Sequence, residues 1–106
     1  MNYPFHWLDG STVSISATSA SAQVALAKQP TGRFQLRIYN AGPSATFIKK
    51  GADSTVTAAT TDFPIPSGGV EVFTVNNTPA APMGNVAAIC AGSGTATVYF
   101  SIGLGD

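Results

Sequence analysis

Alternation of apolar and polar residues along the stretch FQLRIYNAGPSATFIKKG constrains the fold more than any other feature of this chain. Phe34, Leu36 and Ile38 occupy every second position of its first half, which is the period of a strand that turns one face to a core. Residues 45–50 resume the alternation after the turn-forming sequence Asn-Ala-Gly-Pro at positions 40–43. The stretch therefore predicts a β-hairpin with its turn at this tetrapeptide.

Shorter runs of the same kind recur along the chain, and turn residues separate them. The Gly-Ser-Gly sequence at 92–94 predicts a second hairpin, and the threonine-rich passage 52–63 predicts a loop with a short strand near Val56. With no helical periodicity, seven to eight short strands predict an all-β fold: a single antiparallel β-sandwich of jelly-roll or Greek-key type. The remaining runs lie at residues 12–17, 22–26, 70–75, 86–91 and 95–102.

Charge is scarce in this sequence. The 106 residues form one domain, and only 9% of them are charged, against about 25% in an ordinary soluble domain. A surface made of small and hydroxylated residues is poorly protected against association, so the composition predicts a surface that neighbouring proteins cover. Five basic residues balance five acidic ones, which argues against nucleic acid as a partner because phosphate binding needs a net basic surface.

Neither export nor a membrane is indicated. The opening sequence MNYPFHWLDG has no basic leader, no long apolar run and no small-residue cleavage site, so it does not match a secretory signal. No stretch approaches the roughly 18 apolar residues of a membrane span. Synthesis in a reducing cytoplasm follows, and the single Cys90 is expected to be a buried, inert thiol.

The first ten residues differ from the rest because they are rich in aromatic side chains. Tyr3, Phe5 and Trp7 alternate there, and the intervening proline suits an edge strand or an extended arm. One interpretation is an edge strand that closes the domain's own core. The other is an arm that lays its aromatic face on an adjacent subunit. We accordingly divide the chain into an aromatic N-terminal arm, 1–10, and a β-sandwich domain, 11–106.

Residues that carry chemistry are few. His6 has no acidic residue spaced to orient it as a general base. Asp53 and Asp62 flank the threonine-rich passage, where they suit an acid/base pair, a calcium site or solvated loop positions. One histidine and one cysteine cannot complete a tetrahedral zinc site within one chain. The sequence therefore predicts no catalytic residue, no metal and no cofactor, and a protein that is not an enzyme.

Three segments together resemble a known class of proteins. They are LRIYNAGPSATFIKKG, TTDFPIPSGGVEVFTV and NVAAICAGSGTATVYFSIGLGD. Their succession resembles small structural proteins of tailed bacteriophage virions, of the head decoration or cement type. The resemblance covers roughly residues 34–106 and implies a β-sandwich or jelly-roll virion component. Such a component sits on the capsid surface, often as a homotrimer, on the lattice of the major capsid protein.

The resemblance implies a non-enzymatic protein that is made in the host cytoplasm and stabilises the assembled phage head. A minor tail or fibre component is the alternative within the same class. Residues 1–10 lie outside the resemblance, so a role for them follows only from their aromatic content. The predicted partner contacts are Tyr3, Phe5, Trp7, Pro64, Ile65 and Pro66.

A carbohydrate- or receptor-binding β-sandwich module is the rival interpretation. Sugar sites need aromatic platforms surrounded by polar side chains. Tyr39 beside Asn40, or Tyr99, supplies such a platform, and Asn76 and Asn77 supply further amides. Binding of glycans in the absence of a capsid distinguishes this module from a cement protein.

Overall fold

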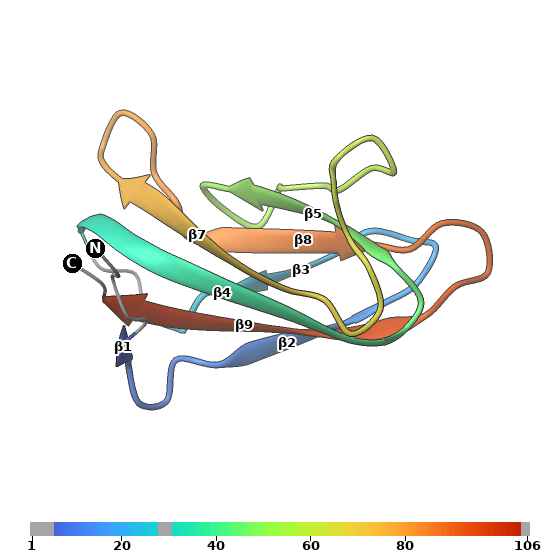
Figure 1. Cartoon of the computed structure of the whole chain (residues 1–106). Coiled ribbons are helices and arrows are strands. Elements are labelled where there is room, and N and C mark those ends of the chain that lie inside the picture. The colour runs from blue at the N-terminus through green and yellow to red at the C-terminus, as the bar shows by residue number, and fades with distance from the viewer. Residues whose placement is uncertain (1–5, 28–30, 105–106) are drawn as a thin grey trace.

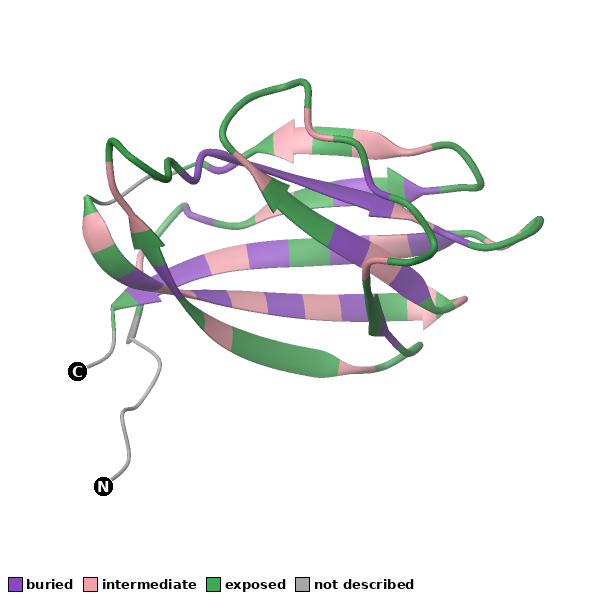
Figure 2. Cartoon of the chain, turned by 90° about the horizontal axis from the view of Figure 1, so that it is seen from above, coloured by how far each residue is buried: buried purple, intermediate pink, exposed green. Residues whose placement is uncertain are grey.

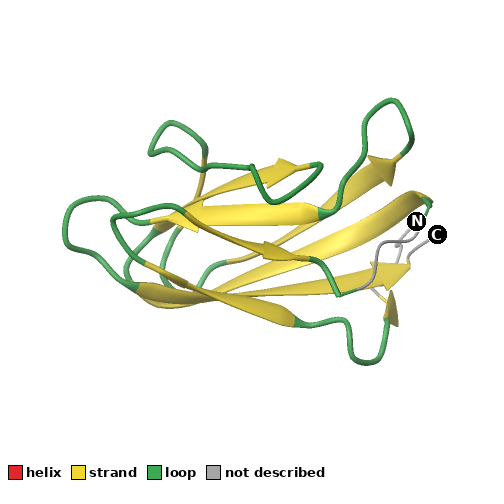
Figure 3. Cartoon of the chain, turned by 180° about the vertical axis from the view of Figure 1, so that it is seen from behind, coloured by secondary structure: helices red, strands yellow, loops and turns green. Residues whose placement is uncertain are grey.

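Two antiparallel β-sheets pack face to face in the computed structural model, which describes residues 6–27 and 31–104 (Figure 1). The described residues form strands and loops and no helix (Figure 3). The strands are β1 (His6–Trp7), β2 (Val13–Ala17), β3 (Ala22–Ala25), β4 (Gly32–Pro43), β5 (Thr46–Gly51), β6 (Phe63–Ile65), β7 (Val70–Asn77), β8 (Asn85–Ile89) and β9 (Ala96–Leu104).

The strand order is that of an eight-stranded jelly roll. Sheet A contains β2, β9, β4 and β7 in that order, and the short β1 pairs with the same edge of β9 as β2. Sheet B contains β3, β8, β5 and β6. From β2 onward the chain changes sheet at every connection except the one from β5 to β6, as two Greek keys require. The predicted antiparallel β-sandwich is confirmed.

Both predicted hairpins are wrong. β4 lies in sheet A and β5 in sheet B, and β8 and β9 are likewise separated. Each connection therefore crosses from one sheet to the other. A strand alternates in the same way whether its sequence neighbour lies beside it or across the core, so alternation does not distinguish a hairpin from a crossing. The threonine-rich passage after Gly51 also forms no strand around Val56.

The core lies between the inner faces of the two sheets. On β4 the predicted inward residues Phe34, Leu36 and Ile38 are 1–2% exposed. Phe100 and Val86 approach from β9 and β8 and are fully buried. The alternation of buried positions along the strands is visible as stripes in Figure 2. Burial of such side chains contributes about 1.5–3 kcal/mol each, which makes this layer the main source of stability.

A buried amide holds one end of the sandwich together. The Asn40 side chain is fully buried, and its Nδ2 donates to the carbonyl oxygens of Ser44 at 2.8 Å and Ile65 at 2.9 Å. Its Oδ1 accepts from the Gly42 N–H at 2.8 Å. Gly42 has a φ of 85°, and a Cβ there would meet the hydroxyl of Ser67. Glycine is therefore required both for the backbone conformation and for the close approach.

The same point joins three segments that are far apart in the sequence. The backbone of Asn40 donates to Gly69 O at 3.0 Å and accepts from Gly68 N at 2.7 Å. Ser44 N donates to Thr95 O at 3.1 Å, which brings in the segment before β9. Turns from these three segments thus form one structural junction.

The loop between β5 and β6 covers the outer face of sheet B. Ala87 pairs with Lys49 on this outer side, yet it is fully buried. Ala58 of the loop is also buried, and its N–H donates to Ser21 Oγ at 2.8 Å. In Figure 1 this green loop lies on the far side of sheet B from sheet A. Sheet A is therefore the sheet with an open outer face.

We expect Asn40→Ala to lower the free energy of unfolding by about 3–4 kcal/mol, measured by urea denaturation. The substitution leaves one buried N–H and two carbonyls without their partner, and each such group costs about 1–3 kcal/mol. Asn76→Ala, at an exposed position of β7, is the control and should change stability by less than about 0.5 kcal/mol. A loss below about 1 kcal/mol for the Asn40 variant would contradict the proposed junction.

Candidate functional site

The outer face of sheet A gathers most of the large apolar side chains that the described residues expose. Trp7 is 70% exposed, Val72 46%, Val70 43% and Tyr99 39%. They come from β1, β7 and β9, so the face spans the sheet from one edge to the other. An exposed apolar patch of this kind marks an interaction surface more often than a single exposed residue does.

Strand register orders these side chains into rows, because directly opposite residues of antiparallel strands share a face. One row runs from Ser14 through Tyr99 and Tyr39 to Val70. The next runs through Ser101 and Arg37 to Val72, and the third through Trp7, Gly103, Gln35 and Thr74. Hydroxyl, amide and guanidinium groups thus share the face with aromatic and aliphatic side chains.

Two stacked tyrosines form the centre of the first row. The ring centroids of Tyr39 and Tyr99 are 6.2 Å apart, and the ring planes differ by 17°. Such a cross-strand aromatic pair stabilises the sheet by up to about 1 kcal/mol. The pair also presents a rigid apolar surface at low entropy cost, which suits a binding partner.

The charges on this face are positive. Arg33 and Arg37 lie on β4 with the same parity as Tyr39, and no carboxylate occupies a described outward position of the strands of sheet A. Glu71 pairs with the buried Ile38 and therefore lies on the other side of the sheet. The face consequently favours a partner that offers carboxylates or hydroxyls.

One polar atom on the face has no partner. The Oε1 atom of Gln35 is shielded from solvent and accepts no hydrogen bond among the described residues. Its cross-strand neighbours are Gly103 of β9, which has no side chain, and Thr74 of β7.

The structure separates the predicted partner contacts. Trp7 lies on β1 at the β9 edge of sheet A, whereas Pro64 and Pro66 are exposed at β6, on the opposite edge of the sandwich. The prediction for Ile65 is wrong, because its side chain is fully buried in the core and is closed to any partner. Tyr3 and Phe5 lie outside the described residues.

The described part of the aromatic segment is an edge strand of the domain itself. His6 and Trp7 pair with Leu104 and Gly103, and Leu8 N donates to Ile102 O at 2.9 Å. Leu8 also packs against the core. The expected boundary after residue 10 therefore falls within the edge of sheet A.

Ser11 joins this edge to β2. Its buried Oγ donates to Ile102 O and accepts from Ile102 N, both at 3.1 Å. The hydroxyl thus takes the place of two backbone hydrogen bonds to β9 in the short segment between β1 and β2, which begins at Val13. This contact holds the exposed Trp7 strand next to β9.

The candidate catalytic and metal residues do not converge. Asp53 accepts from the N–H and hydroxyl of Thr55, which lower the pKa of the carboxyl. Asp62 accepts from Ala59 N at 2.7 Å, so each carboxylate closes its own turn. The described residues contain no group of three histidine, cysteine or acidic side chains suited to a metal ion. The side chain of His6 lies outside what the structure describes.

Sequence reasoning missed the contribution of Val70, Val72 and Arg37 to this face. The sequence does show that Val70 and Val72 are both apolar and, being two residues apart, lie on the same face of their strand. An apolar pair with equal parity ordinarily points to the core. Only the register of β7 against β4 places this pair on the outside.

No protein family, curated protein or solved structure matches this chain. Among the described residues there is no helix long and apolar enough to cross a membrane.

We expect the Cys90 thiol to be unreactive in the folded protein. It is 1% exposed, and burial raises its pKa, so both access and the thiolate fraction are low. Reaction with a disulfide reagent at pH 8 should be at least about 100-fold slower in buffer than in 8 M urea. Complete reaction of the folded chain within seconds would contradict this burial.

The same raised pKa sets a pH dependence of stability. The protonated thiol is favoured in the fold, so its contribution to the free energy of unfolding is intact below the unfolded pKa of about 8.5 and declines as the pH rises above it. Urea titrations between pH 7 and pH 10 measure this decline. Cys90→Ala, which removes the thiol, should show a smaller decline over the same range.

Proposed function

We propose that this chain is a non-enzymatic structural protein of a tailed bacteriophage virion that decorates and stabilises the assembled head. Two observations support the proposal. The three turn segments that resemble phage decoration proteins form one structural junction around Asn40. Jelly rolls also occur in viral capsid proteins, and that likeness is one of fold alone.

The open outer face of sheet A is the observation that carries the proposal. Protein interfaces are enriched in tryptophan, tyrosine and arginine and depleted in lysine and acidic residues. Trp7, Tyr39, Tyr99 and the two arginines of β4 match that composition. We assign this face to the capsid, with Trp7 and Tyr99 as apolar anchors and Arg37 as a partner for carboxylates of the capsid protein.

Stabilisation follows from binding alone. A protein that binds the assembled lattice but not its free subunits shifts the equilibrium toward the assembled state by mass action. Many copies on one shell add their contributions. The chain then needs no chemistry, and a flat face with few charges suffices.

Trp7→Ala and Tyr99→Ala should each weaken binding to empty shells of the cognate major capsid protein by about tenfold or more. Each substitution removes an exposed aromatic anchor, and truncation of such anchors commonly costs 1–2 kcal/mol or more. Cosedimentation of the purified protein with shells measures the affinity. Urea denaturation should show that each variant remains folded.

Phe47→Ala is the matched control, because Phe47 is an aromatic residue of β5 on the outer side of sheet B, outside the proposed face. It should bind shells as the unmodified chain does. If the variant that lacks both Trp7 and Tyr99 side chains binds shells undiminished, the face is not the capsid-binding surface.

The carbohydrate- or receptor-binding module is the second candidate, and the Tyr39–Tyr99 pair is the observation that favours it. The pair lies beside Arg37 and Ser101 in the neighbouring row, which offers a stacking surface with polar groups next to it. Glycan binding without any capsid, lost in the Tyr99→Ala variant, would support this module. Binding to shells together with no glycan binding would leave the decoration protein.

A further inference from the structure

β7 is an edge strand of sheet A. It pairs with β4 on one side, and no described strand pairs with its other side. The strand is eight residues long and contains neither proline nor lysine, although these are residues that commonly protect sheet edges. Its free edge therefore offers a row of backbone donors and acceptors to a further strand.

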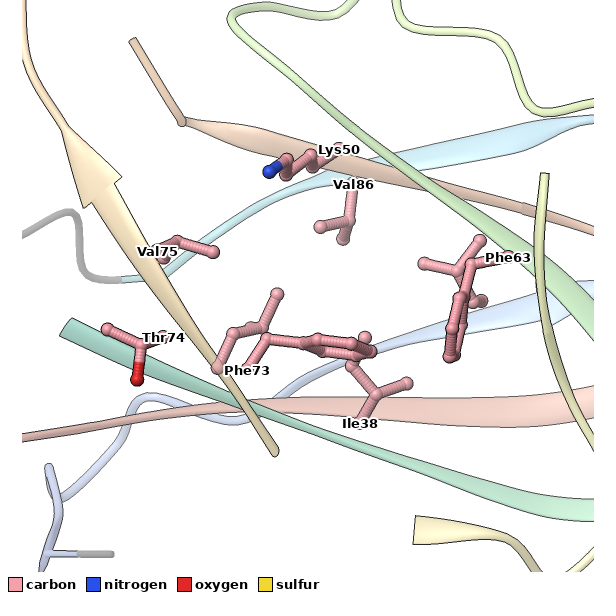
Figure 4. Close-up of a pocket in the computed structure, with 9 residues that line it drawn as sticks. Ile38, Lys50, Phe63, Phe73, Thr74, Val75 and Val86 are labelled. Carbon is pink, nitrogen blue, oxygen red and sulfur yellow. The ribbon is translucent and has the colours of Figure 1, made fainter. Parts of the chain in front are cut away.

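An apolar groove runs beside this edge, on the inner side of sheet A (Figure 4). Its volume is about 250 Å³, and it lies between β7 and the β5–β6 edge of sheet B. Phe73 and Phe63 meet edge to face in it, with ring centroids 5.2 Å apart. The remaining lining residues are Leu36, Ile38, Ile48, Lys50, Thr74, Val75 and Val86.

Within residues 6–27 and 31–104, Lys50 is the one charged residue that lines this groove, and Glu71 lies on β7 outside its lining. In Figure 4 the ammonium of Lys50 lies across the groove from β7, on the side of Val75. Glu71 precedes Phe73 by two positions on the same side of β7, so it lies toward the other end. Both side chains are exposed, and neither forms an ion pair among the described residues.

We propose that a second copy of this chain occupies the edge, with β7 antiparallel to β7 of the other copy and Phe73 opposite Phe73. This register places Glu71 opposite Val75 of the second copy, beside the Lys50 that lines the groove there. A two-fold axis repeats the contact, so two ion pairs flank a central pair of aromatic rings. The backbone edges complete the ladder, as in strand addition.

Self-complementarity selects a second copy over a strand from a different protein. Glu71 precedes Phe73 by two residues on β7, and Val75, which follows Phe73 by two residues, lines the groove together with Lys50 of β5. A two-fold axis at Phe73 therefore brings the acid of each copy toward the base of the other. A partner from another protein would need neither the acid nor the base at these positions. The inference does not depend on the proposed function.

Sedimentation equilibrium of the full chain tests the pairing. The unmodified protein should associate to twice its chain mass of 10.8 kDa. Glu71→Lys and Lys50→Glu should each raise the dissociation constant about tenfold or more, because each replaces two attractions by two repulsions. The variant that carries both substitutions restores opposite charges and should return to within about threefold of the unmodified chain.

Matched charge changes elsewhere are the controls. Lys49→Glu lies on the opposite face of β5, and Asp9→Lys lies at the other edge of sheet A; both should leave association unchanged. Urea denaturation should show that all variants remain folded, since every changed side chain is exposed. A monomer at all concentrations, a mass of three chains, or a double variant no better than the single ones would overturn the proposal.

The two proposals fail separately. Trp7→Ala and Tyr99→Ala should weaken binding to shells and leave the mass unchanged, because neither residue lies on β7. Loss of shell binding without a change in mass bears on the outer face alone. Loss of association in the Glu71 and Lys50 variants bears on the β7 edge alone.

Discussion

The hydrogen bonds of the Asn40 amide are the constraint on which the rest of the structure depends. Nδ2 donates to the carbonyl of Ser44, just before β5, and to the carbonyl of Ile65, the last residue of β6. These bonds tie β4 of sheet A to β5 and β6 of sheet B. Loss of these hydrogen bonds would leave several buried polar groups without partners. The resulting free-energy cost favours the one path by which the chain crosses between the sheets. The backbone of Asn40 also holds Gly68 and Gly69, which places the start of β7 beside β4.

The inward position of Asn40 determines what the outer face of sheet A displays. Because strand residues alternate, Tyr39 and Arg37 point outward while Asn40 and Ile38 point inward. The covering loop buries Ala87 on the outside of sheet B, and no loop among residues 6–27 and 31–104 buries the tyrosines. The asymmetry between the two sheets therefore has two local causes. The Asn40 amide determines which residues of β4 point inward and which outward, and the long β5–β6 connection covers the outer face of sheet B.

The sequence predicts the strands better than it predicts their partners. Alternation located β4, β7 and β9 because burial of one face is a local property of a strand. It did not reveal that β4 and β5 belong to different sheets, since that choice depends on hydrogen bonds to Ile65, 25 residues away. Ile65 itself lies between two prolines and looked exposed, but β6 turns it into the core. The sequence left open whether Trp7 closes the domain's own core or faces a partner, and the outward direction of Val72 likewise depends on the non-local register with Arg37.

The two proposed surfaces are geometrically compatible. Opposite residues of antiparallel strands share a face, so pairing of two β7 strands extends sheet A without turning it over. Val72 of one copy would then lie opposite Thr74 of the other, and the outer faces of both copies would form one continuous surface. Such a surface carries two tyrosine pairs and two copies of Arg37. A capsid lattice presents the same binding site many times, so it can engage both halves of this surface at once. The second contact becomes intramolecular, so a weak face on each copy yields tight attachment of the pair.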